Sequence, residues 1–177
     1  SALVIALDLS KSMNAEDIRP SRLARARLKL SDLLQQRREG QTALIAYAAT
    51  AYTVTPLTDD FKTIDSLLSS LDPDIMPAQG SRADLAVESA LQLFNNAGIA
   101  DGDILLITDG VTARVRRSIQ QLETRGYRLS VLAVGSEDGA PIPVSGGGFV
   151  KDREGSIVVS KTDSRQLQQL AQAMGGV

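Results

Sequence analysis

The chain has no cysteine and no histidine. Without cysteine it can form neither a disulfide framework nor a thiolate metal site, and the redox compartment cannot be read from cysteine usage. Without histidine it lacks the commonest general base, every Ser-His-Asp arrangement, and most zinc and non-haem iron sites. These two absences exclude a large part of enzyme chemistry.

The chain also lacks a strong net charge and a long apolar run. Its 19 basic and 21 acidic residues give a formal charge of −2, too weak a field to favour nucleic acid or an anionic membrane as partner. No window approaches the roughly 20 apolar residues of a membrane helix, and no signal peptide precedes the first strand. Any membrane contact is therefore expected through segments outside this chain.

The length of 177 residues and the hydrophobic content of 43% fit one core, so residues 1–177 are predicted to form a single domain. The chain starts one or two residues before an apolar strand that should be central. We therefore expect it to be part of a longer protein.

Strands and helices are predicted to alternate along the chain. Short apolar runs predict strands at 3–7, 42–48, 103–110 and 128–134, with a last strand at 156–160. A further strand at 51–57 follows so closely that it must be antiparallel, and Pro56 places it at an edge. Helical spacing predicts helices at 21–37, 61–71, 81–95, 113–124 and 163–174, and 136–155 is predicted as a loop, either irregular throughout or with a small hairpin. The expected fold is an α/β three-layer sandwich, Rossmann-like, with a central mostly parallel sheet and helices on both faces.

Polar side chains follow two of the apolar runs where the predicted strands end. Asp8 closes the first run and is followed by Ser10 and Ser12, and Asp109 closes a later one. Open α/β sheets bind ligands outside the carboxyl ends of their strands, and Ser81 can reach the same edge if the preceding loop folds back. Carboxylates and hydroxyls are the ligands that hard divalent cations prefer. The sequence therefore predicts a Mg²⁺ or Mn²⁺ site formed by Asp8, Ser10, Ser12, Ser81 and Asp109.

Each of these residues also has a plainer interpretation. Asp8 or Asp109 alone is equally typical of a turn or helix cap, and Ser81 could be the N-cap of the next helix. If the two aspartates do meet, they repel each other without metal, so at least one should have a raised pKa. Asp109→Asn is then expected to abolish metal binding and to leave the metal-free domain as stable as, or more stable than, its parent.

Three motifs resemble the von Willebrand factor A domain family. DLSKS at 8–12 is similar to its DxSxS motif, Gly80–Ser81 stands where the family carries Gly-Thr, and ITDG at 107–110 is similar to the segment with its second aspartate. The resemblance covers nearly the whole chain and implies a metal-ion-dependent adhesion site (MIDAS) at the five residues named above. Lys11 departs from the usual glycine and Ser81 from the usual threonine, which implies weaker affinity, with Lys11 pointing to solvent or to an acidic partner.

A narrower resemblance is to the bacterial aerotolerance-type (Bat) membrane-anchored proteins. It is carried by segments such as DIRPSRL, PLTDD, MPAQG and LQQLAQAMGG. It implies a domain anchored to the bacterial inner membrane, on the periplasmic side or otherwise the cytoplasmic side, and an association with a MoxR-type AAA ATPase or with other such domains.

These residues favour one of three candidate functions over the other two. The favoured one is a non-enzymatic protein-binding module whose metal accepts a carboxylate from a partner, with Lys11, Arg82 and the loop around Met76 as the rim. The alternative is a Mg-dependent phosphoryl-transfer hydrolase, which usually needs a second carboxylate where Ser10 stands. A nucleotide-binding fold needs a glycine-rich loop after the first strand, and DLSKSMN has no glycine.

Overall fold

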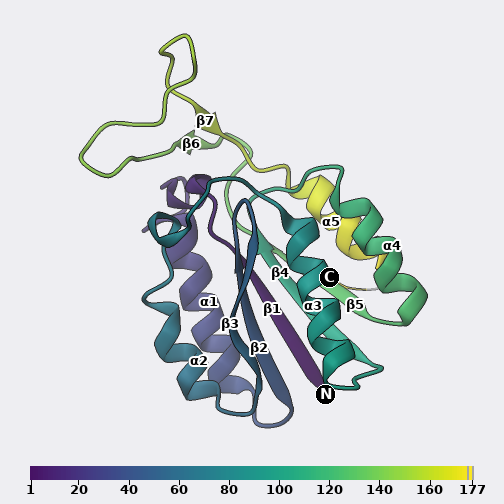
Figure 1. The fold of residues 1–177 in the computed structure, drawn as a ribbon. Coiled ribbons are helices and arrows are strands. Elements are labelled where there is room, and N and C mark those ends of the chain that lie inside the picture. Colours follow the sequence, from purple (N-terminus) through teal and green to yellow (C-terminus); the bar gives the residue numbers. More distant parts are fainter. Residues whose placement is uncertain (175, 177) are drawn as a thin grey trace.

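The computed structural model of the chain describes residues 1–174 and 176. At its centre is a five-stranded sheet in the order β3-β2-β1-β4-β5 (Figure 1). Its strands are β1 (Ala2–Asp8), β2 (Gln41–Tyr47), β3 (Ala51–Thr58), β4 (Gly102–Thr108) and β5 (Arg128–Ala133). All neighbours pair in parallel except β2 and β3, which are antiparallel. The expected edge position of β3 is confirmed.

Helices cover both faces of this sheet. Leu3, Ile5 and Leu7 of β1 face one way, into a core with α1 (Arg22–Gln36) and α2 (Phe61–Leu68). The alternate residues Val4 and Ala6 face the other core, with α3 (Ala83–Asn96) and α4 (Val115–Arg125). The last helix, α5 (Ser164–Ala173), lies beside β5 on the α4 side (Figure 1). Because β1 is buried on both faces it reads as an unbroken apolar run, and the predicted three-layer α/β fold is confirmed.

Two connections at the carboxyl edge of the sheet contain short 3₁₀ helices. The first, η1 (Lys11–Asn14), follows β1 directly, and the second, η2 (Pro73–Ile75), lies in the predicted loop before α3. The C-terminal end of α2 and both ends of α3 differ from the predicted ranges by a few residues, since helix termini depend on capping contacts rather than on periodicity.

Residues 136–160 form a projecting arm, and the prediction of a strand over all of 156–160 was wrong. Within this range β7 (Val159–Ser160) is a two-residue strand that pairs with β6 (Ala140–Pro141) apart from the main sheet, and Ile157 forms an isolated antiparallel bridge with Lys151. Two tight turns complete the arm, at 144–148 and 152–156, and it rises above the carboxyl edge of the sheet (Figure 1). The apolar pattern of this segment reflects pairing within the arm. No helix among the described residues has the length and apolar character needed to cross a membrane.

Candidate metal centre

The residues that follow β1 form a tight turn around the Asp8 carboxylate. Asp8 is completely buried, and its Oδ1 accepts a hydrogen bond from the backbone N–H of Ser10 at 2.8 Å. The hydroxyls of Ser10 and Ser12 lie 3.0 Å apart. The chain then enters η1, with the N–H of Met13 bonded to the carbonyl of Ser10 at 3.0 Å. This turn brings three of the predicted ligands together within five residues.

Ser81 joins them because its loop folds back over the sheet. The N–H of Arg82 donates to the carbonyl of Ala48 at 2.8 Å, which fixes the loop against the turn between β2 and β3. A side chain at Gly80 would place its Cβ 3.0 Å from the Cα of Ala49, so this close approach favours glycine. The Ser81 hydroxyl then lies 3.5 Å from Asp8 Oδ2. Ser81 precedes α3, whose N-cap is Arg82, so the N-cap interpretation of Ser81 is wrong.

Thr108, the last residue of β4, holds the other side of the Asp8 carboxyl. Its hydroxyl lies 2.6 Å from Asp8 Oδ2 and 2.7 Å from the carbonyl oxygen of Gly110. One hydroxyl proton cannot serve both acceptors at once, but a protonated Asp8 could donate to Thr108 while Thr108 donates to Gly110. Burial, and next the charge of Asp109, raise the pKa of Asp8 to about 7. The expectation of a raised carboxyl pKa is met at Asp8.

The raised pKa of Asp8 predicts that the metal-free domain becomes less stable as the pH rises from about 4 to about 7. In this interval the folded state keeps the Asp8 proton while the unfolded chain has lost it. Raising the pH through this interval therefore favours the unfolded state. The full stabilising contribution of Asp8 is present only below about pH 4. Urea denaturation in chelator at about pH 5 and about pH 7.5 should show the loss in the parent and a smaller loss in Asp8→Asn. Equal losses of stability in the parent and in Asp8→Asn would contradict this prediction.

Asp109 lies next to Thr108 and is held by an arginine that sequence reasoning missed. The Nη1 of Arg22 donates to Asp109 Oδ2 at 2.9 Å, and Arg22 also forms a two-bonded ion pair with Asp17. The side chain of Arg22 is 0% exposed and that of Asp17 is 4% exposed. Burial alone would raise the pKa of Asp17, but its hydrogen bonds from Arg22 and Ser136 outweigh this and hold its pKa well below its usual value. The sequence did indicate that Arg22 lies on the buried face of α1, because it continues the spacing of the buried residues Ala26 and Leu30.

Tyr47 is a second buried polar residue beside the site. It pairs with Asp8 in the register between β1 and β2, and its hydroxyl is buried with no hydrogen-bond partner among the described residues. Burial, and next the charge of Asp8, raise its pKa well above the usual value. The phenol therefore stays neutral and adds no charge to the site.

The charges and the oxygen ligands of this edge fit a hard divalent cation. Asp17 and Asp109 pair with a single guanidinium, that of Arg22, and Asp8 lies buried close to Asp109, so the ionised forms of the three carboxyls leave two negative charges uncompensated. Within residues 1–174 and 176 there is no group of three or more His, Cys, Asp or Glu side chains that could hold a metal. The predicted set of two carboxylates and three serine hydroxyls would suit Mg²⁺ or Mn²⁺ with some retained water.

The residues predicted as the rim differ in exposure. Lys11 is exposed, and Arg82 is half-buried and paired with Asp84 at 2.7 Å. In the loop around Met76, the Met76 side chain itself is buried. Ile75, which is 57% exposed, presents the apolar side chain of that loop instead. Arg114, Arg116 and Arg117 are exposed near the start of α4.

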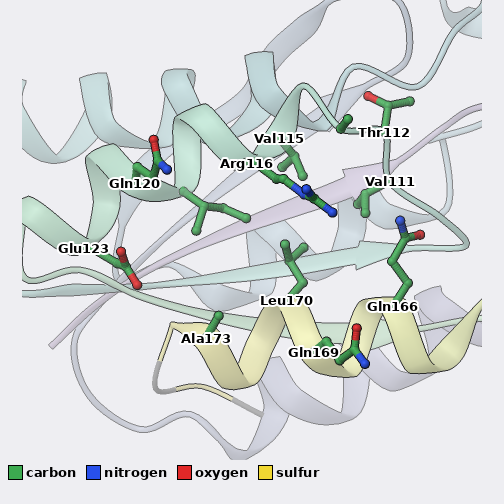
Figure 2. Close-up of a pocket in the computed structure, with 12 residues that line it drawn as sticks. Val111, Thr112, Val115, Arg116, Gln120, Glu123, Gln166, Gln169, Leu170 and Ala173 are labelled. Atoms are coloured by element: carbon green, nitrogen blue, oxygen red, sulfur yellow. The ribbon is translucent and has the colours of Figure 1, made fainter.

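A groove of about 380 Å³ lies between α4 and α5, outside the cluster around Asp8. Arg116 from α4 and Gln166 and Leu170 from α5 face it (Figure 2). Its lining contains a single carboxylate, that of Glu123, and none of the predicted metal ligands. We therefore assign the candidate chemistry to the edge around Asp8.

Comparison with known families gives a match over more than half of the chain. The family model described as von Willebrand factor type A domain matches residues 3–111. That range includes the five predicted ligands and excludes the arm.

Two solved structures resemble the whole chain. One is an aerotolerance-related membrane protein from Bacteroides fragilis, and the other is a protein called BatB from Bacteroides thetaiotaomicron. Each has a TM-score of 0.91 and 32% identity and covers 99% of this chain, and the alignments cover 88% and 87% of those chains respectively. The strand order and helix arrangement described above are therefore shared with these bacterial proteins.

More distant similarities extend the comparison. A UPF0353 protein from Mycolicibacterium paratuberculosis is 25% identical over 188 residues, covering 99% of this chain and 54% of the relative, so the chain spans about half of that protein. Proximal thread matrix protein 1 from mussel byssus, described with a zinc-occupied MIDAS motif, has a TM-score of 0.62 and 17% identity. The alignment covers 76% of this chain and 36% of the mussel chain. At that identity the likeness concerns the fold alone.

Proposed function

Because the chain belongs to the von Willebrand factor type A domain family, as the match over residues 3–111 shows, we propose that it is a metal-ion-dependent protein-binding module. The proposed ligands are Asp8, Ser10, Ser12, Ser81 and Asp109, and the proposed ion is Mg²⁺ or Mn²⁺. The observation that carries this proposal is the hydrogen-bonded cluster of Asp8 with the three serines at one sheet edge. A zinc ion described in the same fold supports it.

The bound ion would supply an electrophilic centre able to accept one more oxygen ligand. The protein's own residues would do the rest. The buried aspartates balance the charge of the ion, and the neutral serine hydroxyls leave it attractive to a carboxylate from a partner. Lys11, exposed beside the turn, would favour an acidic partner surface. Specificity would then come from Lys11, Ile75 and the arm around this contact.

We propose no chemistry on the partner. The sequence has no histidine or cysteine to move a proton near the ion, and the position where a phosphoryl-transfer enzyme usually carries its second acid is Ser10. The hydroxyl of Ser10 lies 3.0 Å from that of Ser12. A phosphatase assay of the domain in Mg²⁺ should show no activity that depends on Asp8.

The proposed biological setting is inferred from the similar bacterial proteins. The similar structures from Bacteroides include one described as an aerotolerance-related membrane protein, and the chain spans about half of its mycobacterial relative. We propose that it is one domain of a longer protein anchored in the bacterial inner membrane, with the domain on the periplasmic side. A MoxR-type AAA ATPase and other domains of this family are the proposed partners.

The test is whether partner binding depends on the ion and on its ligands. Binding of a MoxR-type ATPase, or of a second domain of this family, should be lost in excess chelator and in Ser12→Ala. Ser69 is an exposed serine at the C-terminal end of α2, so Ser69→Ala is the matched control and should bind like the parent. Substitution of one particular Asp or Glu on the partner should have the same effect as the chelator. Undiminished binding in chelator would show that the partner docks elsewhere.

A further inference from the structure

The side chain of Arg22 connects the candidate metal centre with the base of the arm. It uses its donors in three directions. Nε and Nη2 donate to the two carboxylate oxygens of Asp17 at 2.8 and 2.7 Å, and Nη1 donates to Asp109 Oδ2 at 2.9 Å. Nη1 and Nη2 also reach the hydroxyl and the carbonyl of Ser160 at 3.1 and 2.7 Å. One buried guanidinium thus binds a proposed metal ligand and the last residue of the arm.

The first residue of the arm reaches the same ion pair. The backbone N–H and the hydroxyl of Ser136 both donate to Asp17 Oδ2 at 2.8 Å, and the N–H of Thr162 donates to the carbonyl of Ser136 at 3.0 Å. Gly135, which has a φ of +119°, leaves no room for a side chain, since a Cβ there would overlap Thr162 Oγ1 and lie 2.8 Å from Arg22 Nε. The two ends of the arm are therefore clamped on the pair of Asp17 and Arg22.

This clamp places no net charge beside the candidate metal centre. The carboxylate of Asp17 neutralises the guanidinium that holds Asp109, so Arg22 can fix the Asp109 side chain without strongly repelling a cation. Arg22 occupies Oδ2 of Asp109, and Oδ1 accepts no hydrogen bond from the described residues. The arrangement orients Asp109 and keeps one oxygen for another ligand.

We propose that Arg22 is a positioning residue that couples metal binding to the arm, an inference that rests on the function proposed above. Arg22 holds Asp109 in its orientation only while Asp17 and Ser160 hold Arg22. A metal bound at Asp109 in turn reduces the freedom of Arg22 and of the two arm ends attached to it. By thermodynamic reciprocity, a fixed arm base strengthens metal binding by the same factor by which metal steadies the arm base. A partner that touches the arm would then tighten the metal contact.

The experiment combines hydrogen exchange with metal titration. Exchange of the amides of Ser136 and Thr162 is measured in the parent domain with and without saturating Mg²⁺ or Mn²⁺, and it should slow by roughly fivefold or more with metal. The amide of Gly155, bonded to the carbonyl of Asp152 in the distal turn of the arm, is the internal control and should not change. Calorimetric titration of the same protein gives the metal affinity.

Variants test the link in the other direction. The double variant Asp17→Asn with Arg22→Gln keeps the net charge and should raise the Kd for Mg²⁺ by roughly fivefold or more, with no metal effect on the arm-base amides. Ser160→Ala removes only the contact between Nη1 and the arm hydroxyl and should raise the Kd by a smaller factor. A merely structural role for Arg22 would lower the melting temperature without making the arm-base amides insensitive to metal.

The outcomes separate this inference from the proposed function. A parent that binds neither Mg²⁺ nor Mn²⁺ overturns both. A parent that binds metal while exchange at Ser136 and Thr162 is unchanged overturns the coupling alone, whether or not the double variant folds. Parental affinity in the folded double variant also overturns the coupling.

Discussion

Arg22→Ala should lower the free energy of unfolding of the metal-free domain by about 3–5 kcal/mol, an effect expected for breaking one partner out of a buried ion pair. The substitution removes a side chain that is 0% exposed and leaves the carboxylates of Asp17 and Asp109 buried with no cation beside them. It also releases Ser160 at the end of the arm. Urea denaturation, followed by circular dichroism in chelator, measures the change.

Arg25→Ala is the matched control for this prediction. Arg25 lies one turn further along α1 and is exposed, so its loss should change the free energy by no more than about 0.5 kcal/mol. Similar small losses in both variants would mean that the contacts of Arg22 contribute little net stability. Complete loss of a cooperative unfolding transition in Arg22→Ala would agree with the upper end of the predicted loss in free energy of unfolding.

The same ion pair changes the expectation for Asp109→Asn. Repulsion alone predicts that this variant is as stable as, or more stable than, the parent without metal. Because Asp109 accepts a hydrogen bond from buried Arg22, its neutral replacement weakens a charge-assisted contact. Asp8, which has no such cation and has the raised pKa, is the position where relief of repulsion is now expected.

Added Mg²⁺ or Mn²⁺ should raise the melting temperature of the parent, and a chelator should reverse the rise. A ligand at a hundred times its Kd stabilises the folded state by about 2.7 kcal/mol, which for a chain of this size is a shift of roughly 5–10 °C. The reason is that only the folded chain brings Asp8, the serines and Asp109 to one edge. Differential scanning fluorimetry over a metal titration measures the shift.

Asp8→Ala removes the carboxylate around which the turn is built, so its melting temperature should not respond to either ion. Asp103→Asn is the matched control. Asp103 lies at the amino end of β4, at the end of the sheet away from Asp8, and pairs with exposed Arg128. Its metal-dependent shift should equal that of the parent. A shift in Asp8→Ala as large as in the parent would place the metal elsewhere in the molecule.

Much of the fold could be predicted from local pattern. The unbroken apolar run of β1 indicated a strand buried on both faces, and the short connection before β3 left only antiparallel pairing for that strand. The turn from Asp8 to Ser12 was visible because its contacts join residues two apart in the chain. In each case the side chains that decide the structure are neighbours in sequence or repeat with the period of one element.

Contacts between distant segments were decided only by the tertiary structure. The sequence of 156–160 showed a short apolar run but not its partner, and β7 pairs within the arm rather than in the main sheet. The position of Arg22 on the buried stripe of α1 could be predicted from helical spacing. Its ion pair with Asp109, by contrast, joins residues 87 apart in the chain. Burial of a charge is tolerated only where partners from other elements surround it, and periodicity within one helix carries no information about those partners. The sequence therefore determined the elements and the local turn of the candidate site, while folding determined the charges that surround it.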